Sequence, residues 1–378
     1  MTGSLHYVWN NPLVVKDFKS AVSLHSHTQY SKESLEFVPR YARRVPVLSQ
    51  LVRQQELRYQ RLHNGRKLDF DRAWWTPPLS AREAYDLERG QIENELGLQG
   101  MVSLSDHDDI EAPMTLHVLS EMTHVPISLE WTVPYGASYF HIGVHNLPVR
   151  WAHGVMERLQ AYTAEPDERK LPELFSILHG LPSTLIILNH PLWDEPGLGP
   201  EEHRNLLTRF LARHREWIHA VELNGLRSWK ENFAVVRLAD DWNIPLISGG
   251  DRHGREPNAI VNLTNASDFP EFVSEVRQDR RSQVLFLHQC REPLRLRLMQ
   301  GVLDVVRDYT DLPEGRRRWT DRVFFRDDED VVKPLSALWE GDGPAIVKLF
   351  MSGVRLLQST RVKNALRAAL ADEQEVSA

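Results

Sequence analysis

Short apolar runs alternate with longer segments of helical periodicity through most of the first 290 residues of this chain. Residues 101–105, 184–188 and 244–248 form runs of strand length, whereas residues 201–217 place apolar side chains at helical spacing. Strands that alternate with helices need crossover connections, which produce a parallel sheet covered by helices. The pattern therefore predicts an α/β fold over residues 1–290, and the number of units favours a closed or nearly closed barrel.

Two parts of the chain depart from this alternation. An arginine-rich insertion of about residues 34–78 follows the first strand; it is too long for a plain loop, and its middle has a helical pattern. Residues 291–378 contain two amphipathic segments joined by a polar stretch. We therefore expect a barrel domain of residues 1–290 that carries the insertion, and a helical C-terminal extension of residues 291–378.

The composition limits the chemistry that the chain can use. Cys290 is the only cysteine among 378 residues, which excludes an intrachain disulfide and a zinc site with several thiolates. No apolar run reaches the length of a membrane span, and the first ten residues lack the pattern of a secretory signal. The net charge of −7 disfavours a general nucleic-acid coat protein. We expect a cytoplasmic protein without membrane contact, in which His, Asp and Glu bind any metal ion.

Two histidines, His25 and His27, directly follow the first apolar run. Because side chains alternate between the faces of a strand, these two imidazoles point the same way and can bind one ion together. Later strand-like runs carry further side chains of ligand type at their ends or within them: Asp106, His107, Glu130, His141, His190, Asp251 and His253. In a parallel barrel the carboxyl ends of all strands open onto one face, so residues far apart in the sequence converge there.

The ligand types indicate which metal ions this face would hold. Imidazoles combined with carboxylates suit zinc, manganese or iron better than calcium. The candidates exceed the four ligands of a closed structural zinc site, which indicates a polynuclear catalytic centre. The chain has 17 histidines, so a single one would more often be structural, but ligands at five or more strand ends are hard to attribute to chance. We expect Glu222 to be structural. The alternative is that it holds a metal-binding side chain in place.

These motifs resemble those of the polymerase and histidinol phosphatase (PHP) superfamily. The segment from His25 to Ser31 is similar to the first motif of this family, and the segment from Leu104 to Asp108 to the second. Four further motifs follow in the family's order: Ser128-Leu-Glu130, His141-Ile-Gly, Asn189-His190-Pro191 and Ser248-Gly-Gly-Asp251-Arg-His253. The resemblance covers about residues 18–290 and implies a distorted (β/α)7 barrel with two or three divalent metal ions, usually zinc, manganese or iron.

The resemblance also implies a ligand set for each ion, with Glu130 as the bridge between the first two: His25, His27, Glu130 and Asp251; Glu130, His141 and His190; and His107 with His253. The chain departs from the family where Ser23 replaces an Asp and where Lys32-Glu33 replaces Asp-Gly. Glu33 would supply the missing carboxylate, or Lys32 would leave the third site weak or empty.

The predicted function is that of a metal-dependent phosphoesterase, which hydrolyses a phosphate mono- or diester of a small molecule such as a nucleotide, or a nucleic-acid end. Two bridged ions lower the pKa of a shared water and present hydroxide near pH 7. Asp251 would orient this hydroxide, and His253 or His107 would protonate the leaving group. Arg252 and Arg255 would grip the phosphate bidentately, unless they pair with acids nearby.

Two other classes of function stay open at the level of sequence. A C–N hydrolase of the amidohydrolase type also begins with His-x-His on a first strand, but it usually relies on a bridging lysine, and no strand-end lysine stands out here. A metal-binding regulatory barrel without activity is the second alternative, and the departures at Ser23 and Lys32 favour it.

The arginine-rich insertion starts shortly after the first ligand pair, so its stem is expected at the rim of the site. It carries nine Arg and Lys against four Asp and Glu, and it ends at Trp74 and Trp75. We predict that it forms a lid that recruits an anionic, nucleotide-like substrate, with Arg40, Arg43 and Arg44 (the arginine triplet) supplying charge. The alternative is an ordinary solvated helix face.

Overall fold

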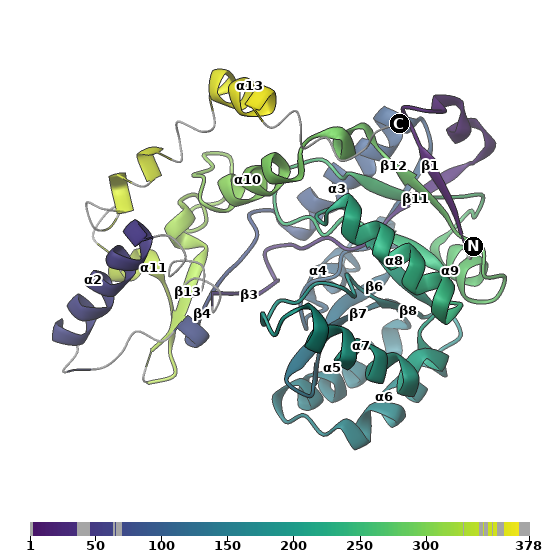
Figure 1. Ribbon diagram of the computed structural model, residues 1–378, viewed down its shortest axis with the longest axis horizontal. Coiled ribbons are helices and arrows are strands. Elements are labelled where there is room, and N and C mark those ends of the chain that lie inside the picture. Colours follow the sequence, from purple (N-terminus) through teal and green to yellow (C-terminus); the bar gives the residue numbers. More distant parts are fainter. Residues whose placement is uncertain are drawn as a thin grey trace. The chain divides into compact units, whose positions relative to one another are not determined.

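The computed structural model describes residues 3–35, 46–62, 65, 70–327, 329–339, 343, 347–349, 351–353 and 359–369. These residues belong to two compact units (Figure 1). The first unit comprises residues 3–31, 79–301 and 366–369, and the second comprises the described parts of 32–78 and 302–365. The chain therefore leaves the first unit after the first ligand pair and returns to it at residue 79.

The first unit contains two five-stranded sheets. One sheet has the strand order β1 (Ser4–Tyr7), β12 (Gln283–Phe286), β11 (Ile260–Thr264), β2 (Ser20–Ser23) and β5 (Gln99–Val102). In this sheet β1 is parallel to β12 and β2 is parallel to β5, whereas β11 is antiparallel to both of its neighbours. Strand β2 is buried along its whole length, which fits its place between two neighbours.

The other sheet has the strand order β10 (Leu246–Gly249), β9 (Ala220–Asn224), β8 (Leu185–Leu188), β7 (Ser138–Leu147) and β6 (Ile127–Tyr135). Strands β8, β9 and β10 are parallel, whereas β7 is antiparallel to both β8 and β6. Only Gly136 and Ala137 separate β6 from β7, and Gly136 has a φ of 60°. Because so short a loop cannot make a crossover, these two strands form a hairpin.

The predicted α/β class is confirmed, but the sheets are mixed rather than parallel, and the described strands do not close into one barrel. The two sheets still meet at the carboxyl ends of their strands. There the chain forms two isolated parallel bridges, which we call the β2–β10 seam and the β5–β6 seam: Ser26 with Arg252, and His107 with Glu130. At the β2–β10 seam the backbone N–H of Asp251 also donates to the carbonyl oxygen of His25, at 2.6 Å.

Helices follow most strands of the first unit, as the alternation predicted: α3 (Ala81–Gln91), α4 (Glu111–Leu116), α5 (Val149–Ala164), α6 (Leu171–His179), α7 (Pro200–His214), α8 (Trp229–Trp242), α9 (Phe269–Arg277) and α10 (Leu294–Val305). A capping box begins α3, because Ser80 and Glu83 each accept a hydrogen bond from the other's backbone N–H. No described helix has the length and apolar character that would let it cross a membrane.

Helices α5, α6 and α7 lie on one side of the second sheet (Figure 1) and share its core. Trp131 of β6 packs among Phe175 of α6 and Tyr162 of α5, and its indole N–H donates to the carbonyl oxygen of Leu159 at 3.2 Å. Because side chains alternate along β6, the residue before Trp131, Glu130, points away from these helices. Packing on one face of β6 therefore fixes a carboxylate on the other.

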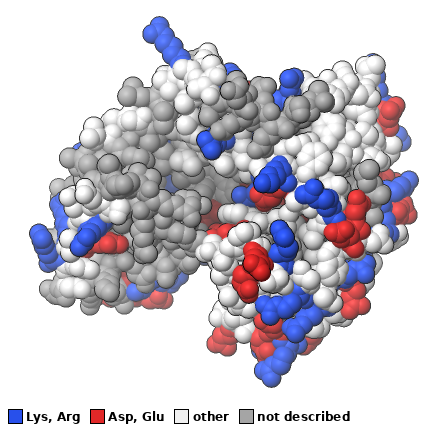
Figure 2. All heavy atoms as spheres, viewed as in Figure 1, with Lys and Arg blue, Asp and Glu red and all other residues white. Residues whose placement is uncertain are grey.

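The outer surface of these helices carries both signs of charge. Figure 2 shows Lys and Arg side chains interspersed with Asp and Glu over this part of the face in view. Exposed ion pairs such as Arg213 with Glu168, at 3.3 Å, are part of this pattern. Mixed charge of this kind keeps a surface solvated and contributes little to stability.

The second unit has a four-stranded antiparallel sheet of β14 (Val332–Pro334), β13 (Val323–Arg326), β4 (Ala73–Trp75) and β3 (Glu33–Ser34). It also contains α2 (Pro46–Leu62), predicted in the insertion, and α11 (Leu335–Leu338). The insertion thus pairs with residues 323–334, so the region 291–378 is not purely helical as we expected. Trp74 packs on Phe324 with ring centroids 6.0 Å apart. The arginine triplet lies outside the described residues.

Candidate metal centre

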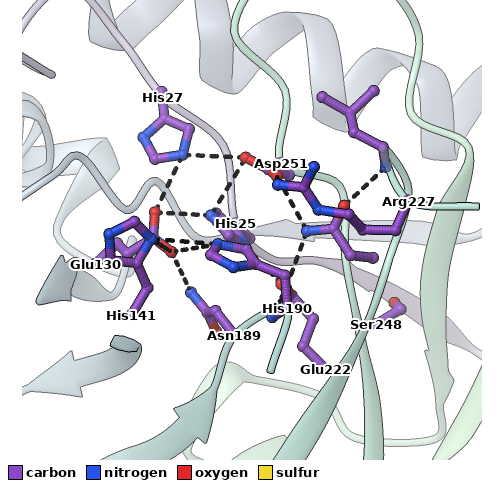
Figure 3. Close-up of polar contacts among 12 residues, drawn as sticks. His25, His27, Glu130, His141, Asn189, His190, Glu222, Arg227, Ser248 and Asp251 are labelled. Atoms are coloured by element: carbon purple, nitrogen blue, oxygen red, sulfur yellow. Dashed lines mark hydrogen bonds and ion pairs between the residues drawn. The ribbon is translucent and has the colours of Figure 1, made fainter. Parts of the chain in front are cut away.

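A dense group of histidines and carboxylates lies where the two sheets of the first unit meet (Figure 3). Nearly every strand around this point supplies a member: His25 and His27 after β2, His107 after β5, Glu130 in β6, His141 in β7, His190 after β8, Glu222 in β9, and Asp251 and His253 after β10. The predicted side chains therefore come together, although the sheets are mixed and Glu130, His141 and Glu222 lie within their strands rather than at the carboxyl ends.

Glu130 lies at the middle of the group and is fully buried. One of its carboxylate oxygens, Oε2, faces Nε2 of His25 at 2.9 Å, Nε2 of His27 at 3.4 Å and Nδ1 of His107 at 3.5 Å. The other, Oε1, faces Nε2 of His190 at 3.1 Å and Nδ1 of His141 at 3.4 Å. The two oxygens thus serve two different groups of imidazoles, which is the placement that a carboxylate needs to bridge two ions.

Asp251 divides its two oxygens in a similar way. Its Oδ1 lies 3.5 Å from Nε2 of both His25 and His27, and 3.6 Å from Nδ1 of His253. Its Oδ2 accepts a hydrogen bond from the side-chain amide of Asn224 at 3.1 Å. One oxygen is thereby directed at the histidines while the other is held by the protein.

His25 is oriented by Glu222, which we expected to be structural. Nδ1 of His25 lies 2.5 Å from Oε1 of Glu222, and Oε2 of Glu222 accepts from the backbone N–H of His190 at 2.9 Å. A carboxylate on Nδ1 fixes the imidazole tautomer with its proton there and leaves Nε2 as the free ligand atom. A side chain at Gly249 would overlap the Glu222 carboxylate, so only glycine allows this approach.

The backbone is strained at three of the candidate ligands. The φ angle is 63° at His25, 26° at His190 and 55° at Asp251. Residues other than glycine seldom adopt positive φ, and each such residue costs of order 1–3 kcal/mol unless its surroundings hold it there. All three lie two residues after the end of a strand, where a left-handed residue turns the chain sharply. Backbone strain concentrated in one cluster is typical of functional sites.

The buried charges shift one another's pKa values. Burial alone would lower the pKa of His25, but the carboxylates of Glu130, Glu222 and Asp251 raise it well above its usual value. Burial opposes ionisation of Glu130 and Asp251, yet the surrounding histidines hold the pKa of both carboxyls well below the usual range. Burial lowers the pKa of His141 despite the nearby Glu130. These shifts favour ionised Glu130 and Asp251 and a neutral His141, the forms that bind metal ions, whereas His25 must release a proton when it binds one.

Three groups of these side chains place one ligand atom each within 4.8 Å of the others: His25, His27 and Asp251; His107, Glu130 and His141; and His25, His190 and Glu222. Each group combines imidazole nitrogens with carboxylate oxygens, a donor set that suits zinc, manganese or iron. The residues therefore fit divalent metal ions, and the two-sided contacts of Glu130 fit a pair of them.

One predicted ligand, Asp106, is placed differently. Both carboxylate oxygens of Asp106 accept hydrogen bonds from Thr28, from its backbone N–H at 2.5 Å and from its hydroxyl at 2.7 Å. Asp106 thereby braces the turn that follows His27, and the three groups above do not include it. Glu33 lies in β3 of the second unit, and its role as a ligand stays a prediction.

The two predicted proton donors, His107 and His253, lie on either side of His27. Their rings stack on that of His27 with centroids 4.7 Å and 4.2 Å away. Their side chains are 18% and 20% exposed, whereas Glu130 and Asp251 are almost completely buried. They therefore form the more open side of the group.

The expected phosphate contact of Arg252 is not what the structure shows. This side chain is 2% exposed, and its Nε donates to Oε1 of Glu88 at 2.7 Å. Asn258 also donates to Glu88, at 2.8 Å, so the ion pair is enclosed by the core. A guanidinium neutralised in this way has little reason to leave its partner. Arg255 is half-buried, and its role in binding phosphate stays a prediction.

Three polar residues of the site were not assigned a role from the sequence: Asn224, and Asn189 and Arg227, which Figure 3 labels. The amide of Asn189 donates to Oε1 of Glu130 at 2.9 Å, and that of Asn224 donates to Glu222 at 3.0 Å. A signal was present for both, because Asn189 ends a strand beside His190 and Asn224 lies two residues after Glu222, on the same strand face. Arg227 had no such signal.

The sequence matches no protein-family model and no curated protein. Similar solved structures include PsfC from Pseudomonas syringae, 18% identical, covering 58% of this chain and 88% of that one with a TM-score of 0.38. A candidate metal-dependent phosphoesterase from Bifidobacterium adolescentis is 12% identical, with 52% and 91% coverage and a TM-score of 0.35. An amidohydrolase from Chromobacterium violaceum, with bound sulfate and no metal, is 13% identical, with 47% and 84% coverage and a TM-score of 0.34. These likenesses have TM-scores below 0.5, so the class is defined by this chain's own fold and side chains. It is an α/β protein with a candidate divalent-metal centre.

Proposed function

We propose that this chain is a metal-dependent phosphoesterase with a distorted (β/α)7 barrel of the PHP type. Its substrate would be a phosphate ester of a small molecule, such as a nucleotide, or a nucleic-acid end, and its setting the cytoplasm. The observation that supports this most is the contact pattern of Glu130, whose two carboxylate oxygens face different groups of histidines. Carboxylates placed in this way hold two ions at the spacing that phosphoester hydrolysis uses.

Two bound divalent ions would provide a hydroxide near neutral pH and neutralise the charge of a phosphate group. The chain's own side chains would then fix the surroundings of that phosphate. Glu222 holds the Nδ1 proton of His25 and so presents Nε2 toward Glu130. Asn189 and Asn224 hold the carboxylates of Glu130 and Asp251 by hydrogen bonds at 2.9 Å and 3.1 Å, so neither acid is free to rotate.

The proton for the leaving group would come from the open side of the centre. His107 and His253 are the most exposed candidate ligands of the first unit, and both rings are stacked on His27. An imidazole at the rim can exchange protons with solvent between turnovers, which a buried one cannot do as readily. We therefore assign protonation of the leaving group to one of these two, and orientation of the attacking water to Asp251.

A C–N hydrolase is the less favoured alternative. The described side chains within 3.5 Å of the Glu130 carboxylate oxygens are five histidines and Asn189, and no lysine is among them. A bridging lysine is the usual partner of a His-x-His pair in amidohydrolases. The donor set around Glu130 therefore supports phosphoryl rather than amide chemistry.

The test is to measure bound metal and hydrolysis on the same sample, after reconstitution with manganese, zinc or iron. We expect at least two ions per chain and hydrolysis of p-nitrophenyl phosphate or bis(p-nitrophenyl) phosphate. The double variant His25→Ala/His27→Ala is the control and should lose both. Fewer than one ion per chain would refute the metal centre. Two ions with amide cleavage only would favour the C–N hydrolase, and two ions with no hydrolysis at all would favour a regulatory barrel.

A further inference from the structure

Arg227 lies beside the candidate metal centre, in the loop after β9 (Figure 3). Its Nη2 atom is 3.7 Å from Oδ2 of Asp251, and its guanidinium carbon lies 3.7 Å from the centroid of the Trp193 ring. Trp193 in turn packs against His190, with ring centroids 5.1 Å apart. A stacked guanidinium keeps its edge, which carries the N–H donors, free while the indole face holds its position. The side chain is 14% exposed, so solvent reaches it.

The donors of Arg227 are not used up by the protein. Within the described part of the chain its Nε is buried without a hydrogen-bond partner, and Oε1 of Glu231, the nearest carboxylate to it, is 4.0 Å away. The 3.7 Å separation from Asp251 is an ion-pair distance that exceeds a hydrogen bond, and Asn224 already donates to that oxygen. Arg252 differs, since it donates to Glu88 at 2.7 Å. Arg227 is thus a positioned cation with donors to spare.

The positive charge of Arg227 suggests which kind of ligand its N–H groups would bind. The Arg227 guanidinium is held only loosely by carboxylates, at 3.7 Å from Asp251 and 4.0 Å from Glu231, so it can still donate to an anionic ligand. A phosphate monoester near neutral pH carries close to two negative charges, whereas a diester carries one. A monoester also has three terminal oxygens, so one remains for Arg227 when two face the ions.

We propose that Arg227 is a substrate-binding residue that donates to a terminal phosphate oxygen and selects monoesters over diesters. This inference rests on the proposed phosphoesterase function and narrows its substrate class. A charge-assisted contact of this kind contributes roughly tenfold to hundredfold to the affinity for an anion. The Trp193 face would keep the guanidinium aligned before the substrate arrives, so little side-chain entropy is lost on binding.

The experiment uses the metal-loaded full chain and three variants. Arg227→Met removes the charge at similar length, Arg227→Lys keeps the charge without the planar fork, and Arg237→Met on the exposed face of α8 is the matched control. Inorganic phosphate is titrated into each protein by calorimetry, metal content is measured, and kcat/KM is compared for p-nitrophenyl phosphate and bis(p-nitrophenyl) phosphate. The calorimetric titration does not depend on turnover.

For Arg227→Met we expect phosphate to bind at least tenfold more weakly and the monoester-to-diester ratio of kcat/KM to fall by a similar factor, with metal content unchanged. Arg227→Lys should fall between this variant and the wild type, and Arg237→Met should match the wild type. Unchanged phosphate affinity in Arg227→Met would overturn the proposal, and so would a loss of metal, because Arg227 would then act by supporting Asp251. If the wild type hydrolyses neither ester, the phosphoesterase proposal fails, while the calorimetry still decides whether Arg227 binds phosphate.

Discussion

Replacing Glu130 by Gln is the sharpest perturbation of this centre, because it removes one charge and almost no volume. The side chain is fully buried and contacts five histidines and Asn189. The amide can keep only one oxygen as an acceptor, so one group of histidines would face an N–H in place of a carboxylate oxygen. We expect the fold to persist, since the packing of Trp131 on the other face of β6 is untouched.

The size of the effect follows from the two-sided contacts. Each carboxylate oxygen would contribute one charged ligand interaction, and a hydrogen bond or contact to a charged group is worth about 1.5–3 kcal/mol. Because the amide keeps one oxygen, one of these interactions is lost, which gives roughly 1.5–3 kcal/mol and about a 10- to 150-fold loss of metal affinity, turnover or both. If Glu130 were purely structural, its replacement would lower thermal stability and leave metal affinity and turnover almost unchanged.

The assay measures metal content by elemental analysis at several fixed free-metal concentrations, together with turnover and the circular dichroism spectrum. Glu202→Gln, on the exposed surface of α7, is the matched control for loss of one carboxylate. Two ions bound with wild-type affinity and turnover within threefold of the wild type would refute the bridging role. Loss of the native spectrum would instead assign Glu130 to the fold.

Three further predictions follow from other parts of the molecule. Glu222→Gln should weaken metal binding by about 10- to 100-fold because His25 loses the acceptor on Nδ1, and a metal titration checks this. Burial lowers the pKa of His214 from 6.5 to about 4, so the unfolded chain takes up a proton first and the free energy of unfolding falls as pH drops below about 6.5. In urea unfolding, His214→Phe should therefore lose roughly 1–2 kcal/mol less of this free energy than the wild type between pH 8 and pH 5. Alanine at all three positions of the arginine triplet should raise KM and flatten the salt dependence of kcat/KM if the insertion recruits anions; unchanged values would favour a solvated face.

The site was more predictable from the sequence than the sheets around it. His25 and His27 were recognisable because strand alternation places both on one face, and Glu130 and Asp251 because each stands where an apolar run ends. The helical spacing of residues 201–217 corresponds to α7, which begins at Pro200 and ends at His214. In each case a local pattern was sufficient.

Features that depend on distant contacts were not predictable in this way. The Gly136 turn makes β6 and β7 a hairpin, but two strand-like runs read the same whether they pair directly or through a crossover. Arg252 carried the signal of a phosphate ligand, and only its distance of 2.7 Å from Glu88 reveals a core ion pair. The pairing of the insertion strand β4 with β13 joins residues about 250 positions apart, which no short sequence pattern records.

The two seams between the sheets have a mechanical consequence. Ligands stand on both, with His25, His27 and Asp251 at the β2–β10 seam and His107 and Glu130 at the β5–β6 seam. Ions held by these residues would join one sheet to the other in addition to main-chain hydrogen bonds at the seams, such as that from His27 to Arg252. The bonds between the ions and their ligands would then be needed both for catalysis and for the two sheets to unfold together. Removal of the ions should let the amide hydrogens of His27, Glu130 and Asp251 exchange with solvent before those in the middle of either sheet.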